Sequence, residues 1–355
     1  MAVLGPLVVA SGTGASLSPV DLTTLAPDEA VFYERGEPTH LVDLQPDTRY
    51  DDIDPALPPF RTLPEPGGRR LCTFATVNDV HFGETICGVL GGENDPGPFF
   101  AVEPGETPYP ETMNRGAIAE IAALDPDLVV VKGDLTSNAA KEELDAFERA
   151  YLDTFGDRLL YVRGNHESYH GVTYAAVPFQ KRVLPGVIVA LLDTSLPSVE
   201  YGGLSADQLE WLDALGASST QPVLVMGHHH VWSPESRVRP ERYFGIKPDD
   251  SEKLIDVVAR HEALRAYFAG HTHRNRVRRF AVSGDVPWVE VSCVKDYPGA
   301  WAEYRVYEGG VVQVFRRISS PDALAWSERT RGMYSGTYHD YAFGAVEDRN
   351  FVLTW

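Results

Sequence analysis

The sequence has 355 residues, of which 43% are apolar and 23% charged, proportions that indicate a soluble globular protein with one large domain and an appendage. Its 31 basic and 51 acidic residues give a net charge of −20, which argues against binding to a nucleic-acid backbone or an anionic membrane surface. A small anionic substrate is still compatible with this charge, because a bound cation can dominate the local field.

The cysteines and the N-terminus bear on the compartment. Cys72, Cys87 and Cys293 match no disulfide framework and no zinc spacing. The stretch MAVLGPLVVASGTGASLS has no basic residue before its apolar part, so we expect it to be a poor signal peptide. No run approaches the ~18 apolar residues of a membrane-spanning helix. We therefore expect a cytoplasmic protein without a membrane partner, and a homo-oligomer is compatible with the sequence.

Residues 1–64 contain no cluster of ligand-type side chains. Two short runs, VFYER and THLVDL, are typical of strands. The phrase LVDLQPDTRY resembles the corner of fibronectin-type β-sandwiches, and a few strands added to the main domain are an equal alternative. The segment PEPGG at 64–68 is predicted to be a linker. We therefore expect a small β-rich extension over residues 1–64.

From residue 70 onwards, short apolar runs with the length of buried strands alternate with segments of helical period. Ser205, followed by Gln208, predicts a helix start closed by a capping box. This alternation predicts an α/β domain around a buried sheet. The apolar runs lie at 71–77, 128–131, 159–162, 187–192, 222–226 and 266–269, and the helical segments at 112–124, 141–155, 205–215 and 251–264.

Three further segments have a less regular pattern. The runs WVEVSCV, AEYRVYE and VVQVFRR follow residue 280 without helices between them and predict an antiparallel β-tail. Residues 318–355 are rich in aromatic side chains, and we expect this C-terminal tail to pack on the core. The stretch 82–114, rich in Gly, Pro and acidic residues, is interpreted with equal weight as an active-site lid or a surface insertion.

Five of the predicted strands are followed directly by residue types that bind metal ions. The motifs are DVH at 79–81, GD at 133–134, GNHE at 164–167, GHHH at 227–230 and GHTH at 270–273. Ligands of an open α/β sheet bind at the carboxyl ends of its strands, so these side chains should converge there. The glycines at 133, 164, 227 and 270 are expected to let the backbone bend at each strand exit.

The chemistry of these side chains predicts a pair of ions. Carboxylate, imidazole and amide ligands without thiolate suit divalent or trivalent Mn, Fe, Zn, Ni or Co. A carboxylate shared by two ions holds them about 3.5–4 Å apart, a geometry suited to displacement at phosphorus.

The ordered series of motifs resembles the calcineurin-like metallophosphoesterase superfamily, and within it the branch of class III cyclic nucleotide phosphodiesterases and glycerophosphodiesterases. The resemblance covers residues 70–317. It implies a four-layer α/β/β/α sandwich over residues 65–317, to which the small N-terminal β-rich extension is added. It also implies a two-metal centre in which Asp79, His81 and His273 hold the first ion, Asn165, His228 and His271 hold the second, and Asp134 bridges both.

The same resemblance implies that His166 is a catalytic residue facing the substrate. The family commonly has His-His-Pro at the fourth motif, where this chain has three histidines. We assign the metal ligand to His228, and His229 stays open either as the ligand or as a substrate contact. Tyr169 and His170 are further candidate substrate contacts, with packing on the domain surface as the equal alternative.

The expected reaction is hydrolysis of a small phosphodiester, of cyclic-nucleotide or glycerophosphodiester type, by a metal-bound hydroxide. His166 would bond a phosphoryl oxygen or protonate the departing oxygen. The alternative is a phosphomonoesterase acting on a nucleotide, a sugar phosphate or another phosphorylated metabolite. A non-catalytic scaffold is disfavoured because no ligand position is substituted, and a nuclease because of the −20 charge.

Overall fold

The structure is a computed structural model that describes residues 20–34, 36–90 and 95–355. The N-terminal stretch expected to be a poor signal peptide lies outside these residues, as do residues 91–94 of the segment 82–114. Within the described ranges, no helix is long and apolar enough to cross a membrane.

Two six-stranded sheets form the centre of the main domain. Sheet I has the order β17-β16-β15-β6-β7-β8, and sheet II has the order β13-β14-β12-β11-β10-β9. The strands of sheet I are β6 (Arg70–Val77), β7 (Leu128–Lys132), β8 (Leu159–Val162), β15 (Ala300–Tyr307), β16 (Gly310–Arg317) and β17 (Phe351–Thr354). Those of sheet II are β9 (Phe179–Leu184), β10 (Val187–Leu192), β11 (Val223–Gly227), β12 (Leu264–Ala269), β13 (Arg276–Arg278) and β14 (Trp288–Glu290).

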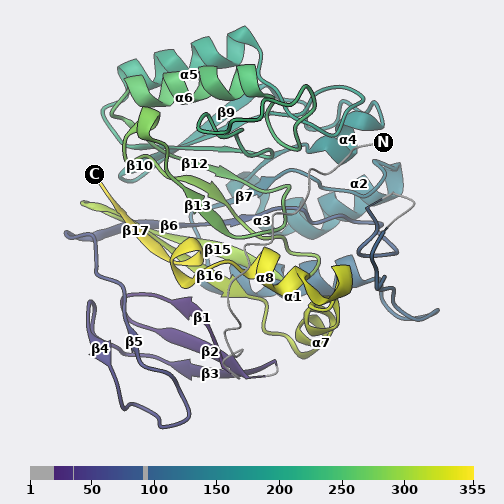
Figure 1. The fold of residues 1–355 in the computed structure, drawn as a ribbon, viewed down its shortest axis with the longest axis vertical. Coiled ribbons are helices and arrows are strands. Elements are labelled where there is room, and N and C mark those ends of the chain that lie inside the picture. Colours follow the sequence, from purple (N-terminus) through teal and green to yellow (C-terminus); the bar gives the residue numbers. More distant parts are fainter. Residues whose placement is uncertain (1–19, 35, 91–94) are drawn as a thin grey trace.

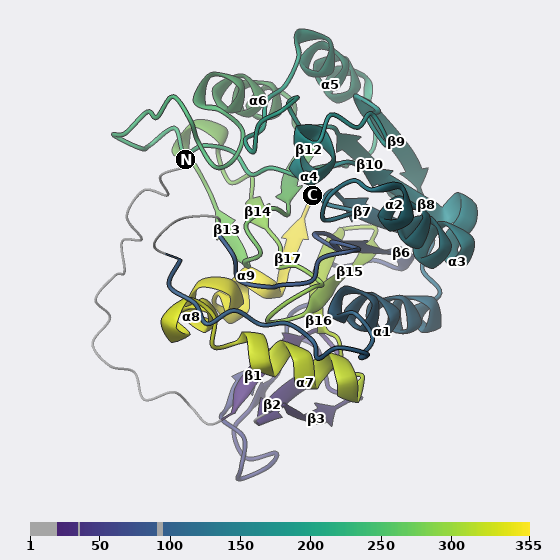
Figure 2. The ribbon, with the colours of Figure 1, turned by 90° about the vertical axis from the view of Figure 1, so that its right-hand side faces the viewer.

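Helices cover the outer faces of both sheets, as Figures 1 and 2 show from two directions. On sheet I lie α1 (Tyr109–Leu124), α2 (Lys141–Phe147), the π-helical turn η1 (Glu148–Leu152), α3 (Asp153–Phe155), η2 (Gly156–Arg158), α7 (Pro321–Thr330), η4 (Tyr334–Gly336) and α8 (Tyr338–Phe343). On sheet II lie α5 (Ala206–Ser218), α6 (Pro248–Arg260) and η3 (Ala281–Ser283). Two further helices are short, α4 (Asn165–Tyr169) and α9 (Val346–Arg349).

The hydrophobic core lies in three layers between these four layers of backbone. Phe74, Val130, Val189, Leu224 and Phe268 are fully buried between the two sheets. Successive side chains of a strand point to opposite faces, so the neighbouring apolar residues of the same strands pack under the helices on each side. Strands buried on both faces therefore appear in the sequence as continuous apolar runs. The predicted four-layer α/β/β/α architecture is confirmed.

The parallel part of each sheet determines where the site lies. In sheet I, β6, β7 and β8 are parallel neighbours, and in sheet II, β10, β11, β12 and β14 are parallel. All six predicted apolar runs are strands, and β8 and β10 have the predicted bounds. The helix after Ser205 is also confirmed, because the Ser205 hydroxyl accepts a hydrogen bond from the Gln208 backbone N–H and the Gln208 side chain accepts one from the Ser205 N–H.

The prediction of one antiparallel tail after residue 280 is wrong for the first of its three runs. WVEVSCV supplies β14, which pairs in parallel with β12 in sheet II. The chain passes from β12 to β14 through the short strand β13 and the turn η3, whereas a helix usually connects two parallel strands. Because no helical segment precedes WVEVSCV in the sequence, the run was not recognised as a parallel strand. The other two runs, β15 and β16, form the expected antiparallel pair in sheet I, and β17 adds its edge strand.

The N-terminal part forms its own small sheets beside sheet I (Figure 1). The Tyr50 hydroxyl accepts a hydrogen bond of 2.8 Å from the Gln45 N–H, which closes the turn within LVDLQPDTRY. Ion pairs join this part to sheet I, because Glu29 lies 2.6 Å from the Arg316 guanidinium and also pairs with Arg305. The strands here are β1 (Asp21–Leu25), β2 (Ala30–Glu34), β3 (Glu37–Leu41), β4 (Arg49–Tyr50) and β5 (Phe60–Arg61).

Candidate metal centre

The seven predicted ligands lie at the carboxyl ends of the parallel strands of both sheets. They leave β6, β7 and β8 of sheet I and β11 and β12 of sheet II, and contacts between their polar atoms show that they converge in space. All are buried except His273, whose side chain is 19% exposed. The set consists of Asp79 and His81 after β6, Asp134 after β7, Asn165 at the start of α4, His228 after β11, and His271 and His273 after β12.

Asp134 lies between two groups of these side chains. Its Oδ2 atom is 3.5 Å from His81 Nε2 and 3.3 Å from His228 Nε2. On the first side, ligand atoms of Asp79, His81 and His273 lie within 4.8 Å of one another. The Asp134 carboxylate therefore contacts the first group through His81 and reaches the second group through His228.

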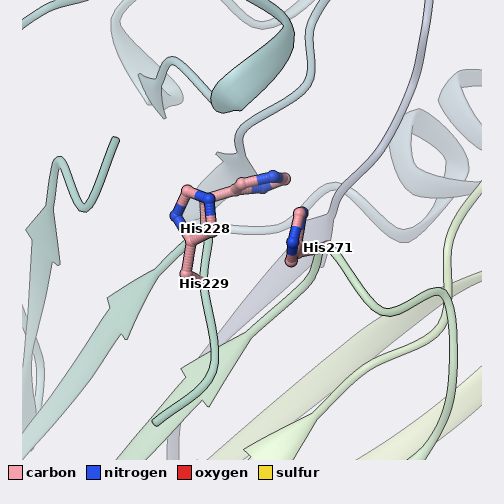
Figure 3. Close-up of side chains that lie close together, drawn as sticks. All are labelled: His228, His229 and His271. Carbon is pink, nitrogen blue, oxygen red and sulfur yellow. The ribbon is translucent and has the colours of Figure 1, made fainter. Parts of the chain in front are cut away.

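The second group is centred on His228 and His271. His228 donates a hydrogen bond of 2.8 Å from Nδ1 to the Lys132 carbonyl, and its Nε2 lies 3.0 Å from Asn165 Oδ1. Figure 3 shows the rings of His228, His229 and His271 gathered from the ends of two strands, and the His228 and His271 ring centroids are 5.0 Å apart. Nitrogen and amide oxygen thus face the same small volume.

Five of the seven residues have a backbone conformation that side-chain-bearing residues rarely adopt. The φ angles are 54° at Asp79, 47° at His81, 49° at Asp134, 66° at His271 and 54° at His273. The left-handed conformation costs an L-residue roughly 1–2 kcal/mol. Such outliers persist where the surrounding structure enforces them, and they concentrate at functional sites. The strain supports a functional role for the strand ends that carry these residues, because turns without strain would be sufficient to connect the strands.

Glycines in these motifs make room for the ligands. The expectation that four glycines bend the chain holds for Gly133, which has a φ of 92°, whereas Gly164, Gly227 and Gly270 have no positive φ. A Cβ atom at Gly164 would collide with the Asp134 carboxylate, and one at Gly270 would lie 2.7 Å from Asp79 Oδ2. These glycines are required because the polar groups of the site approach the backbone closely.

The donor set fits cations. Both ring nitrogens of His81 and the Nε2 of His271 are buried without a hydrogen-bond partner, which is costly for polar groups unless a ligand satisfies them. Burial and neighbouring imidazoles lower the pKa of both histidines, so their rings are neutral and able to bind metal. Although burial alone would lower it, the Asp134 carboxylate raises the pKa of His228 to about 9, so a cation bound at this ring would take the place of a proton.

A sequence model of the calcineurin-like phosphoesterase family matches residues 72–275, more than half of the chain, and spans all five motifs. The chain belongs to the calcineurin-like phosphoesterase family. The resemblance inferred from the motifs is thereby confirmed, and the dinuclear divalent metal centre of calcineurin-like phosphoesterases agrees with the two groups of ligands described above.

Curated relatives of this calcineurin-like phosphoesterase match a little over two fifths of the chain. It is 27% identical over 154 residues to a probable cyclic nucleotide phosphodiesterase of Synechococcus, covering 42% of this chain and 58% of the relative. It is 28% identical over 167 residues to a probable glycerophosphodiester phosphodiesterase of Arcobacter nitrofigilis, covering 42% and 57%. It is 26% identical over 161 residues to the 3',5'-cyclic adenosine monophosphate phosphodiesterase of Escherichia coli K12, covering 42% and 54%. The matches span just over half the length of these relatives.

Among solved structures, a dimetal phosphatase from Danio rerio is similar to the chain with a TM-score of 0.51 and 18% identity. The similarity covers 70% of this chain and 98% of that chain. At this identity it shows the fold alone, and it agrees with the four-layer architecture.

His166 lies at the edge of the two groups. Its Nδ1 donates a hydrogen bond of 2.7 Å to the Ser137 carbonyl, so its Nε2 faces the site and lies 3.9 Å from Asp134 Oδ2. The side chain is 26% exposed, and a molecule entering from solvent can therefore reach it. The His166 and His81 ring centroids are 4.4 Å apart, which places His166 beside the first group.

The three candidate substrate contacts differ in how accessible they are. Tyr169 is half-buried with its ring centroid 5.0 Å from that of His166, and His170 is exposed beside it. His229 is fully buried, and both of its ring nitrogens have partners. Nδ1 accepts a hydrogen bond of 2.8 Å from the Thr194 hydroxyl, and Nε2 donates one of 3.2 Å to the Glu200 carbonyl. Both ring nitrogens of His229 are thus engaged within the protein, and one of them also lies within 4.8 Å of ligand atoms of His228 and His271.

The sequence analysis missed several residues beside the site. Phe244 packs on His271 with ring centroids 4.0 Å apart and remains 40% exposed, so it forms an aromatic wall at the rim. No local sequence pattern indicated Phe244, which lies in a long connection. Glu84, Lys295 and Asp296 form a buried charged cluster behind the first group. Glu84 lies three residues after His81, and Lys295 and Asp296 follow the run at 288–294, whose strand β14 already ends at Glu290.

Proposed function

We propose that the chain is a dinuclear-metal phosphoesterase that hydrolyses a phosphodiester of a small molecule. The observation that carries the proposal is the Asp134 carboxylate between two groups of metal-binding side chains, five of which have strained backbones. The first ion would be held by Asp79, His81 and His273, the second by Asn165, His228 and His271, and Asp134 would be shared.

The hydrogen bonds at the fourth motif favour His228 over His229 as a ligand of the second ion. His228 uses only Nδ1 for a backbone carbonyl, which leaves the Nε2 lone pair facing Asn165 and Asp134. His229 uses both nitrogens within the protein. A histidine whose second nitrogen donates to a backbone carbonyl has a fixed ring and a fixed tautomer, as metal ligands usually do.

When bound, two divalent cations supply Lewis-acid charge that lowers the pKa of water and neutralises the non-bridging oxygens of a phosphate ester. The role of His166 follows from its own contacts. The Nδ1–H bond to the Ser137 carbonyl holds the ring in place and stabilises the imidazolium that forms if Nε2 gains a proton. His166 would therefore hydrogen-bond a phosphoryl oxygen through Nε2 and deliver a proton from that atom to the departing oxygen.

The choice of a diester rests on the relatives, which are named for cyclic nucleotides and glycerophosphodiesters. The −20 net charge favours a small substrate over a polynucleotide. The purified protein should therefore release nitrophenol faster from bis-p-nitrophenyl phosphate than from p-nitrophenyl phosphate. The opposite preference would make a phosphomonoesterase the better assignment, and salt-dependent binding of DNA would point to a nuclease.

Two substitutions test the assigned roles, with elemental analysis as the readout for metal. His166→Ala should keep two ions per chain and lose about 10²–10⁴-fold in turnover, because the proton donor is removed. Asp134→Ala should lose both ions. His261, which bonds Asp213 in the contact between α5 and α6, is the control histidine, and His261→Ala should keep ions and turnover. Full activity of His166→Ala, or two ions in Asp134→Ala, would contradict the assignment.

We also place the protein in the cytoplasm. Its three cysteines are free and buried, which fits a reducing compartment. Fractionation of cells that express the tagged chain measures this directly, and recovery outside the cytoplasmic fraction would contradict it.

A further inference from the structure

Each histidine of the first group has one nitrogen toward the site and the other toward a carboxylate behind it. His81 Nε2 lies 3.5 Å from Asp134 Oδ2, and its Nδ1 lies 3.4 Å from Glu84 Oε2, a close contact of the two groups that does not have the geometry of a hydrogen bond. His273 Nε2 lies 3.4 Å from Asp79 Oδ1, and its Nδ1 hydrogen-bonds Asp296 Oδ2 at 3.3 Å. Neither Glu84 nor Asp296 is among the seven predicted ligands, and each contacts the Nδ1 side of its histidine, opposite to the nitrogen that faces Asp134 or Asp79.

A single ammonium group joins these two carboxylates. Lys295 Nζ is 2.8 Å from Glu84 Oε2 and 3.3 Å from Asp296 Oδ2. The Lys295 side chain is only 6% exposed, so its charge is held by these contacts. An ammonium buried without partners would be strongly unfavourable, and a pair of carboxylates without it would repel each other.

Two further side chains hold Asp296 in place, and a third contacts only the main chain of Lys295. The Tyr338 hydroxyl of α8 donates a hydrogen bond of 2.6 Å to Asp296 Oδ1, and the Cys293 thiol donates one of 2.9 Å to the same atom. The Trp326 indole N–H donates to the Lys295 carbonyl at 2.9 Å. Asp296 is thus held by the Tyr338 hydroxyl and the Cys293 thiol in addition to Lys295 and His273, and its orientation is determined by the protein.

His228 of the second group is supported differently. His228 donates its second nitrogen to the backbone carbonyl of Lys132, which carries no net charge. A carboxylate behind a histidine raises the basicity of the ring as a ligand, whereas a carbonyl mainly fixes its orientation. His228 therefore differs from His81 and His273 in the group that lies behind its ring.

We propose that Lys295 is a positioning residue of the first metal site, where it fixes Glu84 and Asp296 so that they orient His81 and His273 with Nε2 toward the ion. The inference rests on the proposed function, because it concerns how one of the two ions is held. Two carboxylates and one ammonium leave this cluster with a net negative charge, which favours a cation in front of the histidines. Lys295 touches neither the ion nor the substrate.

Lys295→Met tests the inference, because it keeps the length of the side chain and removes the ammonium. Loaded with Mn²⁺, the wild-type protein should hold two ions per chain and give the electron paramagnetic resonance signal of a coupled pair. The variant should lose affinity for one ion by about 10–100-fold and give the signal of a single ion after dialysis. The second ion should keep its wild-type affinity in a chelator competition.

Trp326→Phe is the matched control. It removes the hydrogen bond to the Lys295 carbonyl and leaves the ammonium in place, so both ions should bind as in the wild type. Glu84→Gln is the second test variant if Lys295→Met does not fold. Glu84 contacts His81 of the first group, so the loss of its charge should also lower the affinity of the protein for one ion.

The outcomes separate this inference from the proposed function. A wild-type chain that takes up no metal contradicts the proposed function itself. A wild-type chain with two ions, together with Lys295→Met or Glu84→Gln that binds both ions with unchanged affinity, overturns the role of Lys295 only. Equal weakening of both ions in Lys295→Met also overturns it, because that result indicates general damage and not the positioning of one pair of histidines.

Discussion

The strained backbone at Asp134 makes a prediction about metal-free stability that does not depend on activity. Asp134→Ala and Asp134→Gly both remove the carboxylate and its contacts with His81 and His228. They differ in one respect, which is that alanine keeps a Cβ atom at a φ of 49° and glycine does not. The difference in the free energy of unfolding between the two variants therefore reports the cost of the left-handed conformation.

The magnitude follows from two opposing effects. A Cβ atom in the left-handed region costs roughly 1–2 kcal/mol in the folded state. Glycine gives the unfolded chain more freedom, which costs folding about 0.4–1 kcal/mol. Asp134→Gly should therefore be more stable than Asp134→Ala by about 1 kcal/mol. Urea unfolding in the presence of a chelator measures the difference without a contribution from bound ions.

The control is another ligand position with ordinary backbone geometry. Asn165 is the first residue of α4 and has no positive φ. Asn165→Gly should therefore be less stable than Asn165→Ala, by up to about 1 kcal/mol in the free energy of unfolding, because glycine disfavours the helix and relieves no strain. The two positions should thus give differences of opposite sign. If Asp134→Ala is as stable as Asp134→Gly, or more so, Asp134 is not held in the left-handed region and the argument from strain fails.

Three further predictions follow from other contacts. Phe244→Ala should raise KM about 2–10-fold with two ions retained, because stacking on an aromatic wall is worth about 0.5–1.5 kcal/mol, and an unchanged KM would remove Phe244 from the pocket. Burial alone would raise the pKa of Glu29, but Arg316 and Arg305 lower it from 4.5 to about 2. The charged Glu29 side chain therefore stabilises the fold by about 3 kcal/mol at most, and this stabilisation is present above pH 4.5 and is lost as pH falls toward 2. The loss of stability in Glu29→Gln should therefore shrink between about pH 6 and pH 3 in urea unfolding, and a constant loss would contradict this. Chelation should lower the thermal midpoint reversibly, since an ion at a thousand times its Kd stabilises by about 4 kcal/mol.

The strands that were predicted correctly, and the polar residues that the structure brings together at their ends, have a local signal in the sequence. A strand buried on both faces must be apolar throughout, so β8 and β10 are visible as runs of the right length. A polar residue directly after such a run lies at the strand exit whatever the rest of the fold does. The ligand types of Asp79, Asp134 and His271 could therefore be assigned to one rim before any contact was known.

Features that depend on tertiary contacts had no such signal. The three-residue strand β14 is parallel only because β13 returns the chain beside it, and nothing in WVEVSCV itself states its direction. The role of Gly164 was misjudged for a similar reason. A glycine after a strand suggests a bend, whereas here the Asp134 carboxylate, which arrives from another strand, occupies the space where a Cβ would lie.

The cluster behind the first group shows why a complete site is harder to predict than its ligands. Lys295 and Glu84 are 211 positions apart, and neither has a periodic or motif-like neighbourhood that pairs it with the other. Their link exists because the exit of β6 and the segment after β14 meet at the same rim. A ligand is identified by its residue type and its place on a strand, but a residue that orients a ligand is identified only by what it touches. The sequence therefore indicates which polar groups converge at the rim, while the different support of His228 and of the histidines of the first group becomes visible only in three dimensions.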